Sequence, residues 1–145
     1  MSMSGRKAVV VPCSGIGKTY GAVAREAAYI LTEDLRPAET GLVALSLLVM
    51  GDAAARDEVA ACPAITLDGC KLACATKMVR ESGGTVAKEL DMLDAFRRNR
   101  AFKPQGIAEL NEAGRMLAQA VAEEASAVVD SLPPATPGQG ERRHA

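Results

Sequence analysis

Aromatic side chains are scarce in this sequence, which has no Trp, two Tyr and two Phe among its 145 residues. A surface that stacks nucleic-acid bases needs such rings, so this kind of binding surface has little material here. The charge is also nearly balanced: a formal net charge of −1 gives no general attraction to nucleic acid or to an anionic membrane. We therefore expect neither a nucleic acid nor a membrane among the partners.

Long hydrophobic runs are absent as well. The apolar run in "KAVVVPC" is about five residues long, which is shorter than the hydrophobic region of a secretory signal. The most apolar stretch, "GLVALSLLVMG", falls short of the roughly 20 residues that a membrane helix needs. Both features predict a cytoplasmic protein. Its four cysteines would then remain thiols, which favours metal binding or redox chemistry over structural disulfides.

Segments typical of strands and helices alternate along the chain. Short apolar, β-branched runs predict strands, and apolar residues that recur at helical spacing predict helices. Asp52 is placed to cap a helix, and Gly83 or Gly84 to end one. The predicted strands cover residues 7–13, 63–70 and 85–93. The predicted helices cover residues 17–36, one or two segments within 38–62 that break near Gly51, 71–81, and 107–132 with Ile107, Leu110, Met116, Leu117 and Val121 on its apolar face.

This alternation predicts an α/β fold. We expect a small three-layer sandwich, in which helices flank a short, mostly parallel, Rossmann-like sheet. One domain should cover residues 1–130, followed by a disordered tail rich in Pro and Gly over residues 131–145. The only histidine, His144, lies in that tail and is not expected to be a ligand.

Three cysteines follow the predicted strands. Cys13 comes directly after the first strand, Cys70 after the second, and Cys74 one helical turn beyond Cys70. Because parallel strands end at the same edge of a sheet, these thiols should converge there, near helix N-termini that favour the thiolate. Thiolates bind soft or borderline metal ions, so Cys13, Cys70 and Cys74 are candidate ligands. Cys62 precedes its strand and is a weaker candidate, as is Asp68, which could instead cap the following helix.

Other interpretations of the same residues remain open. One of the thiols could act as a low-pKa nucleophile in thiol, persulfide or sulfur transfer, or the cysteines could simply be buried apolar side chains. "PCSGIGKT" resembles a nucleotide-binding P-loop, but Pro12 stands where the first glycine belongs, so a P-loop-like phosphate-binding enzyme is a remote alternative. A small anion could still bind beside the thiols. The candidate residues for this anion loop are Ser14, Gly15, Gly17 and Lys18.

Three stretches, "PCSGIGKTYGAVAREAAY", "LDGCKLACATK" and "KPQGIAELNEAGRMLAQAVAEE", resemble the DGC domain family over about Val9 to Glu124. Members of this family are described as zinc-binding proteins, so the resemblance implies a zinc ion held by cysteines, three of which match Cys13, Cys70 and Cys74. The resemblance puts the fourth cysteine in the segment "LVALSLL", where this chain has Ala44. Cys62, a water molecule or another side chain would have to take its place. Zinc handling or delivery to a protein partner is the expected role, and three thiolates could also hold an iron–sulfur cluster.

Overall fold

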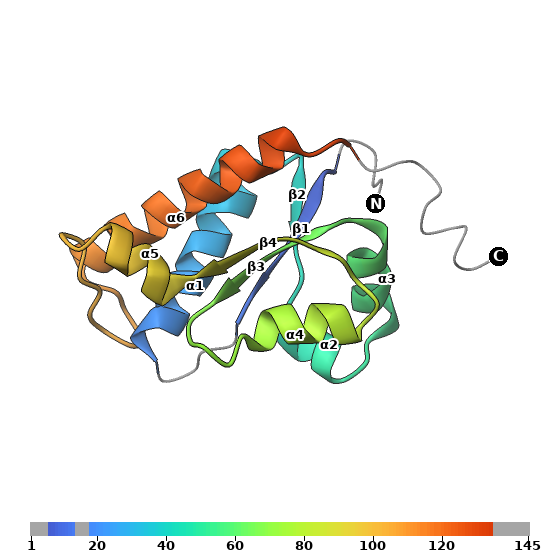
Figure 1. Ribbon diagram of the computed structural model, residues 1–145, viewed down its shortest axis with the longest axis horizontal. Helices are drawn as coiled ribbons and strands as arrows, with labels where there is room; N and C mark the ends of the chain where they lie inside the picture. Colours follow the sequence, from blue (N-terminus) through green and yellow to red (C-terminus); the bar gives the residue numbers. More distant parts are fainter. Residues whose placement is uncertain (1–5, 14–17, 135–145) are drawn as a thin grey trace.

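A four-stranded parallel sheet lies at the centre of the computed structural model, which describes residues 6–13 and 18–134 (Figure 1). The strand order is β2-β1-β3-β4, and every paired strand is parallel to its neighbour. This arrangement confirms the predicted α/β class. The strands are β1 (Ala8–Pro12), β2 (Thr40–Leu42), β3 (Ala64–Asp68) and β4 (Val86–Asp91).

Helices cover both faces of the sheet and complete the three layers (Figure 1). On one face lie α1 (Thr19–Tyr29), its π-helical continuation η1 (Ile30–Leu35), α5 (Met92–Arg98) and α6 (Glu112–Ser131). On the other face lie α2 (Leu45–Val49), α3 (Ala53–Ala61) and α4 (Cys74–Glu81). Within the described residues, no helix combines the length and the apolar character needed to cross a membrane.

The central strands are apolar because they are covered on both faces. Val9, Val10 and Val11 of β1 are completely buried, and all five residues of β3 are buried. An apolar run without alternation is the pattern of a strand covered by helices on both sides. Strand β4 lies at the edge of the sheet and exposes polar side chains, including Lys88 and Glu89. The core therefore lies around β1 and β3, and the loops that follow these strands have a rigid base.

The helix boundaries follow local signals where those signals are strong. The Asp52 side chain accepts a hydrogen bond from the N–H of Ala55 and caps α3, as predicted. Gly83 ends α4 with a φ of 86°, a left-handed conformation that favours glycine. Helix α6 is capped by Asn111, whose side chain accepts a hydrogen bond from the N–H of Gly114.

Several predicted segments differ from the structure. Strand β2 lies in a region predicted to be helical, and α5 begins inside the segment predicted as the end of a strand. The long C-terminal helix starts at Glu112 rather than at Ile107. The predicted apolar face of that helix was wrong at two positions, because the side chains of Ile107 and Met116 are 54% and 46% exposed. Residues 135–145 of the predicted tail lie outside the described part of the chain.

Candidate functional site

The candidate site lies where β1 and β3 end side by side. The chain leaves β1 toward β2 at one edge of the sheet and later returns to β3 on the other side of β1. In open α/β sheets, ligands bind in the crevice that such a reversal creates at the carboxyl ends of the strands. Cys13 directly follows β1, and Gly69 and Cys70 directly follow β3. The thiols thus occur at the part of the fold where a ligand site is expected.

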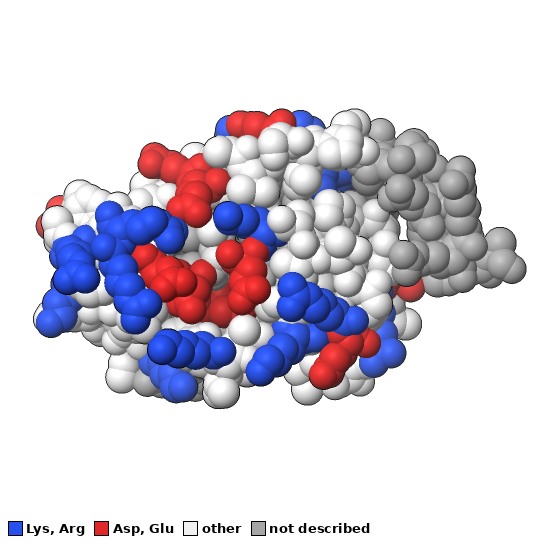
Figure 2. Space-filling view, in the orientation of Figure 1, with Lys and Arg blue, Asp and Glu red and all other residues white. Residues whose placement is uncertain are grey.

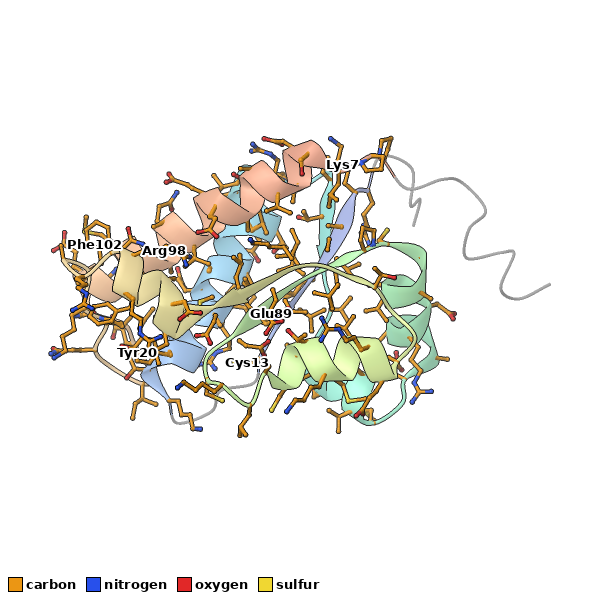
Figure 3. All side chains as sticks on the ribbon, viewed as in Figure 1. Lys7, Cys13, Tyr20, Glu89, Arg98 and Phe102 are labelled. Carbon is orange, nitrogen blue, oxygen red and sulfur yellow. The ribbon has the colours of Figure 1, made fainter. Side chains whose placement is uncertain are left out.

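Cys13 is the buried member of the group, with 8% of its surface exposed. Figure 3 shows it at the end of β1, beside the beginning of α4. Its Sγ accepts a hydrogen bond of 3.2 Å from the N–H of Gly69, which links the loops after the two strands. Burial raises the pKa of the Cys13 thiol above its ordinary value of 9.0, although the Gly69 N–H opposes this by favouring the thiolate. Repulsion from Asp68, and from Cys70 and Cys74 when they are ionised, also raises the pKa of Cys13.

Gly69 permits this linkage because it has no side chain. A Cβ at this position would lie 2.9 Å from the backbone nitrogen of Gly21 and 3.0 Å from the carbonyl carbon of Tyr20. Contacts this short between Cβ and backbone are almost never tolerated, so only glycine lets the loop after β3 pack directly against the first turn of α1. The glycine therefore holds three segments together: the loops after β1 and β3, and the start of α1.

Asp68 fixes the position of α4. Its carboxylate is 2% exposed and accepts hydrogen bonds from the N–H of Ala75 at 2.9 Å, the N–H of Thr76 at 3.3 Å and the hydroxyl of Thr76 at 2.7 Å. The Thr76 hydroxyl is in turn 2.6 Å from the hydroxyl of Thr66 in β3. Because Thr76 donates its proton to Asp68, Thr66 must be the donor to Thr76. A buried chain of hydrogen bonds thus attaches the N-terminus of α4 to β3, and Asp68 acts as the helix cap.

The loop between the two remaining thiols carries backbone strain. Ala73 has a φ of 51°, and it is the only non-glycine residue with a positive φ in the described part of the chain. This conformation costs an ordinary L-residue roughly 1–2 kcal/mol. The N–H of Ala73 donates to the carbonyl oxygen of Cys70, which closes the turn immediately before α4. Cys74 is exposed at the first position of that helix, and Cys70 is half-buried.

The three thiols line one pocket of about 380 Å³. Its other polar side chains among the described residues are Lys18, at the start of α1, and the buried Asp68. The remaining wall is largely aliphatic and comes from α2 and from the loop before α4. The lining residues are Cys13, Lys18, Gly21, Leu45, Val49, Asp68, Gly69, Cys70, Leu72 and Cys74.

Comparison with known protein families gives a match over most of the chain. The DGC domain matches residues 9–128, a range that contains all three pocket cysteines. The chain belongs to the DGC domain family. No curated protein and no solved structure matches the chain.

The three letters of the DGC motif have separate physical roles in this structure. Asp68 caps α4, Gly69 allows the close approach of α1, and Cys70 contributes a thiol to the pocket. Cys13, Cys70 and Cys74, which were expected to converge at the strand ends, line the same pocket. For Asp68, the structure favours the cap over the ligand, because both carboxylate oxygens already accept hydrogen bonds from α4.

Other candidate residues of the DGC domain have different positions. Cys62 lies at the opposite end of β3, does not line the pocket, and is 2% exposed; burial raises the pKa of its thiol. Lys18 lines the pocket, whereas Ser14, Gly15 and Gly17 of the predicted anion loop lie outside the described residues. Sequence patterns did not identify the aliphatic wall. The one sequence feature that could have indicated this wall is Leu72, an apolar residue that follows Lys71 in a loop.

The three sulfur atoms are of the type that binds thiophilic metal ions, but they do not surround one point. Three sulfur ligands from separate segments line the same pocket. Among the described residues, however, no group of three or more His, Cys, Asp or Glu side chains is arranged to hold a metal ion as it stands. Binding would therefore require the side chains that carry these thiols to rearrange.

Proposed function

We propose that this DGC domain binds a thiophilic metal ion, with zinc as the first candidate, through the thiolates of Cys13, Cys70 and Cys74. The observation that carries the proposal is that three thiols, 57 and four residues apart in sequence, line one pocket at the carboxyl edge of the sheet. A metal ion bound there would suit a role in metal handling or delivery. Three protein ligands leave one coordination position open, as in zinc sites that exchange a ligand.

The electrostatics of the pocket support a cation. Ionised Cys13 would be close to three further groups that are negative when ionised, and these charges raise its pKa. A metal ion replaces the protons and removes this repulsion, so binding should be accompanied by proton release. The apolar side chains in the wall lower the local dielectric constant, which strengthens the attraction between a thiolate and a cation.

Thiol or persulfide chemistry at a low-pKa cysteine is less well supported as an alternative. At Cys13 such chemistry would need a thiol that ionises readily, whereas burial raises the pKa of this thiol. The P-loop-like alternative is also weak. Pro12 is the last residue of β1, and the N–H of the next residue, Cys13, already donates to the carbonyl oxygen of Leu67 at 2.8 Å. Neither residue therefore offers a backbone N–H to a phosphate.

Elemental analysis and native mass spectrometry of protein purified without chelator would test the proposal. We expect about one metal ion per chain in the wild type, and its loss in Cys13→Ser, Cys70→Ser and Cys74→Ser. Cys62→Ser is the matched control, because this buried cysteine lies outside the pocket, and it should retain the ion. A metal-free wild type with one thiol that alkylates rapidly at mildly acidic pH would favour the sulfur-transfer alternative. A brown anaerobic preparation would indicate an iron–sulfur cluster instead of a single ion.

A further inference from the structure

A second hollow adjoins the thiol pocket on the side of β2. It has a volume of about 300 Å³ and shares Cys13 and Leu45 with the thiol pocket. The loop after β3 bounds the thiol pocket, whereas the end of β2 and the segment after it bound this hollow. We call it the second hollow. The lining residues that decide its chemistry are Cys13, Arg25, Tyr29, Leu42, Ala44 and Leu45.

The second hollow lies at a reversal of the chain. Strands β1 and β2 are neighbours, but α1, which follows β1, lies on one face of the sheet and α2, which follows β2, lies on the other (Figure 1). In open α/β sheets such a reversal leaves a crevice at the carboxyl ends of the two strands, and ligands bind there. Of the three pocket thiols only that of Cys13 belongs to the second hollow, so a ligand in this hollow does not depend on a bound metal ion.

Most of the wall of the second hollow is apolar. Leu42 ends β2, and Ala44 and Leu45 lie at the start of α2. Leu42 is 40% exposed, so a ligand that covers its side chain removes apolar surface from water. Sites for small molecules combine an apolar wall of this kind with a few polar groups. The wall therefore fits a ligand with an apolar chain.

Arg25 is the one charged residue among the described residues that line the second hollow. It is half-buried on α1, one helical turn before Tyr29, and the side chains of Tyr29 and Ser46 add hydroxyl groups to the wall. A guanidinium has five N–H donors and can bind both oxygens of a carboxylate. Arg25 already interacts within the chain, and its five donors allow it to bind a ligand as well. The polar part of the hollow therefore fits a carboxylate.

Charges of both signs occur beyond the second hollow. A neighbouring hollow along α1 shares Arg25 and Tyr29 and is also lined by Glu26, Glu109 and Arg115, so two carboxylates and two guanidinium groups balance there. On the face shown in Figure 2, acidic and basic side chains likewise lie side by side. The second hollow differs, because its described lining residues include no carboxylate. The balance around it favours a ligand with a single negative charge over a polyanion.

We propose that the second hollow binds a small aliphatic carboxylic acid. The carboxylate pairs with the guanidinium of Arg25, and the aliphatic chain lies against Leu42 and Leu45 in the direction of Cys13. Binding is non-covalent and needs no metal ion, so this site is separate from the proposed metal-binding function, although Cys13 borders both.

Hexanoate is a suitable probe, and its binding can be followed by the shifts of backbone amide signals in NMR spectra of the ¹⁵N-labelled chain. We expect the amides of Tyr29, Leu42 and Leu45 to shift as hexanoate is added. Arg25→Gln should weaken binding at least about tenfold, because it removes the charged partner of the carboxylate. Arg115→Gln is the matched control: Arg115 lines the neighbouring hollow but not the second hollow, so the affinity should change less than about twofold.

A second variant tests the place of the aliphatic chain. Ala44 is exposed and has an extended backbone conformation, with φ −72° and ψ 130°, so Ala44→Leu introduces no backbone strain but fills the hollow and should abolish binding. Hexylamine should bind at least about tenfold more weakly than hexanoate, because it brings a positive charge to Arg25. Equal binding of hexylamine, or hexanoate shifts that persist in Ala44→Leu, would overturn the proposal. Cys70→Ser, which removes a proposed metal ligand, should bind hexanoate as the wild type does, so failure of the metal site leaves this result unchanged.

Discussion

Replacing Asp68 with asparagine tests whether this carboxylate holds α4 and its cysteine in place. The substitution preserves the size of the side chain but replaces one acceptor oxygen with an NH₂ group. In the structure the carboxylate accepts three hydrogen bonds, from the N–H of Ala75 and from the N–H and hydroxyl of Thr76. The asparagine side chain could keep the bond to Ala75, but its NH₂ group would then face donors on Thr76.

The expected cost follows from the burial of these groups. A hydrogen bond to a charged partner contributes about 1.5–3 kcal/mol, and leaving a buried donor without an acceptor costs about 1–3 kcal/mol. Asp68 is 2% exposed and Thr76 is 1% exposed, so water cannot replace the lost bonds. We therefore expect Asp68→Asn to lower the free energy of unfolding by about 2–4 kcal/mol. Hydrogen exchange at the Ala75 and Thr76 amides should become faster.

Urea unfolding followed by circular dichroism measures this difference. Asp52→Asn is the matched control, because Asp52 caps α3 at a more exposed position and asparagine caps helices as well as aspartate does; it should change stability by less than about 0.5 kcal/mol. A double-mutant cycle with Thr76→Val should give a coupling of about 1 kcal/mol or more, since the two side chains share a hydrogen bond. If Asp68→Asn unfolds like the wild type and the amides of α4 exchange at the same rate, the carboxylate does not anchor this helix.

Three further predictions concern other positions. Gly69→Ala should lower the free energy of unfolding in urea by about 1–3 kcal/mol, because its methyl group would overlap the backbone of α1, and a variant as stable as the wild type would contradict the close approach. Burial raises the pKa of Cys62 above 9.0, so the thiol ionises first in the unfolded chain and the free energy of unfolding should fall as pH rises above about 9. Cys62→Ser should reduce this fall in urea titrations, and an unchanged dependence of stability on pH would refute a role for Cys62. Ala44 and Cys13 line a common hollow of about 300 Å³, so Ala44→Cys should bind zinc at least about tenfold more tightly in competition with a chromophoric chelator; unchanged affinity would show that position 44 does not reach the ion.

The sequence predicted the elements whose signals are local and strong. The run Val9 to Val11 predicted a buried strand, Asp52 predicted a helix cap, and Gly83 or Gly84 a helix end; all three features are observed, the last at Gly83. Strand β2 could not be predicted in the same way, because it has only three residues and exists through its pairing with β1. Helix α5 was missed because Asp91 ends β4 and at the same time caps the next helix, which leaves no loop between them.

By itself the sequence determined the approximate place of the three thiols. Cys13 and Cys70 follow strands, and the carboxyl ends of parallel strands share one edge of a sheet, so spacing along the chain was sufficient. Only the tertiary structure decided what surrounds them. Whether Asp68 acts as a cap or a ligand depended on where α4 begins, and the aliphatic wall of the pocket depended on how α2 packs beside α4. Such contacts join residues that are distant in sequence, so the local periodicity of apolar residues does not predict them.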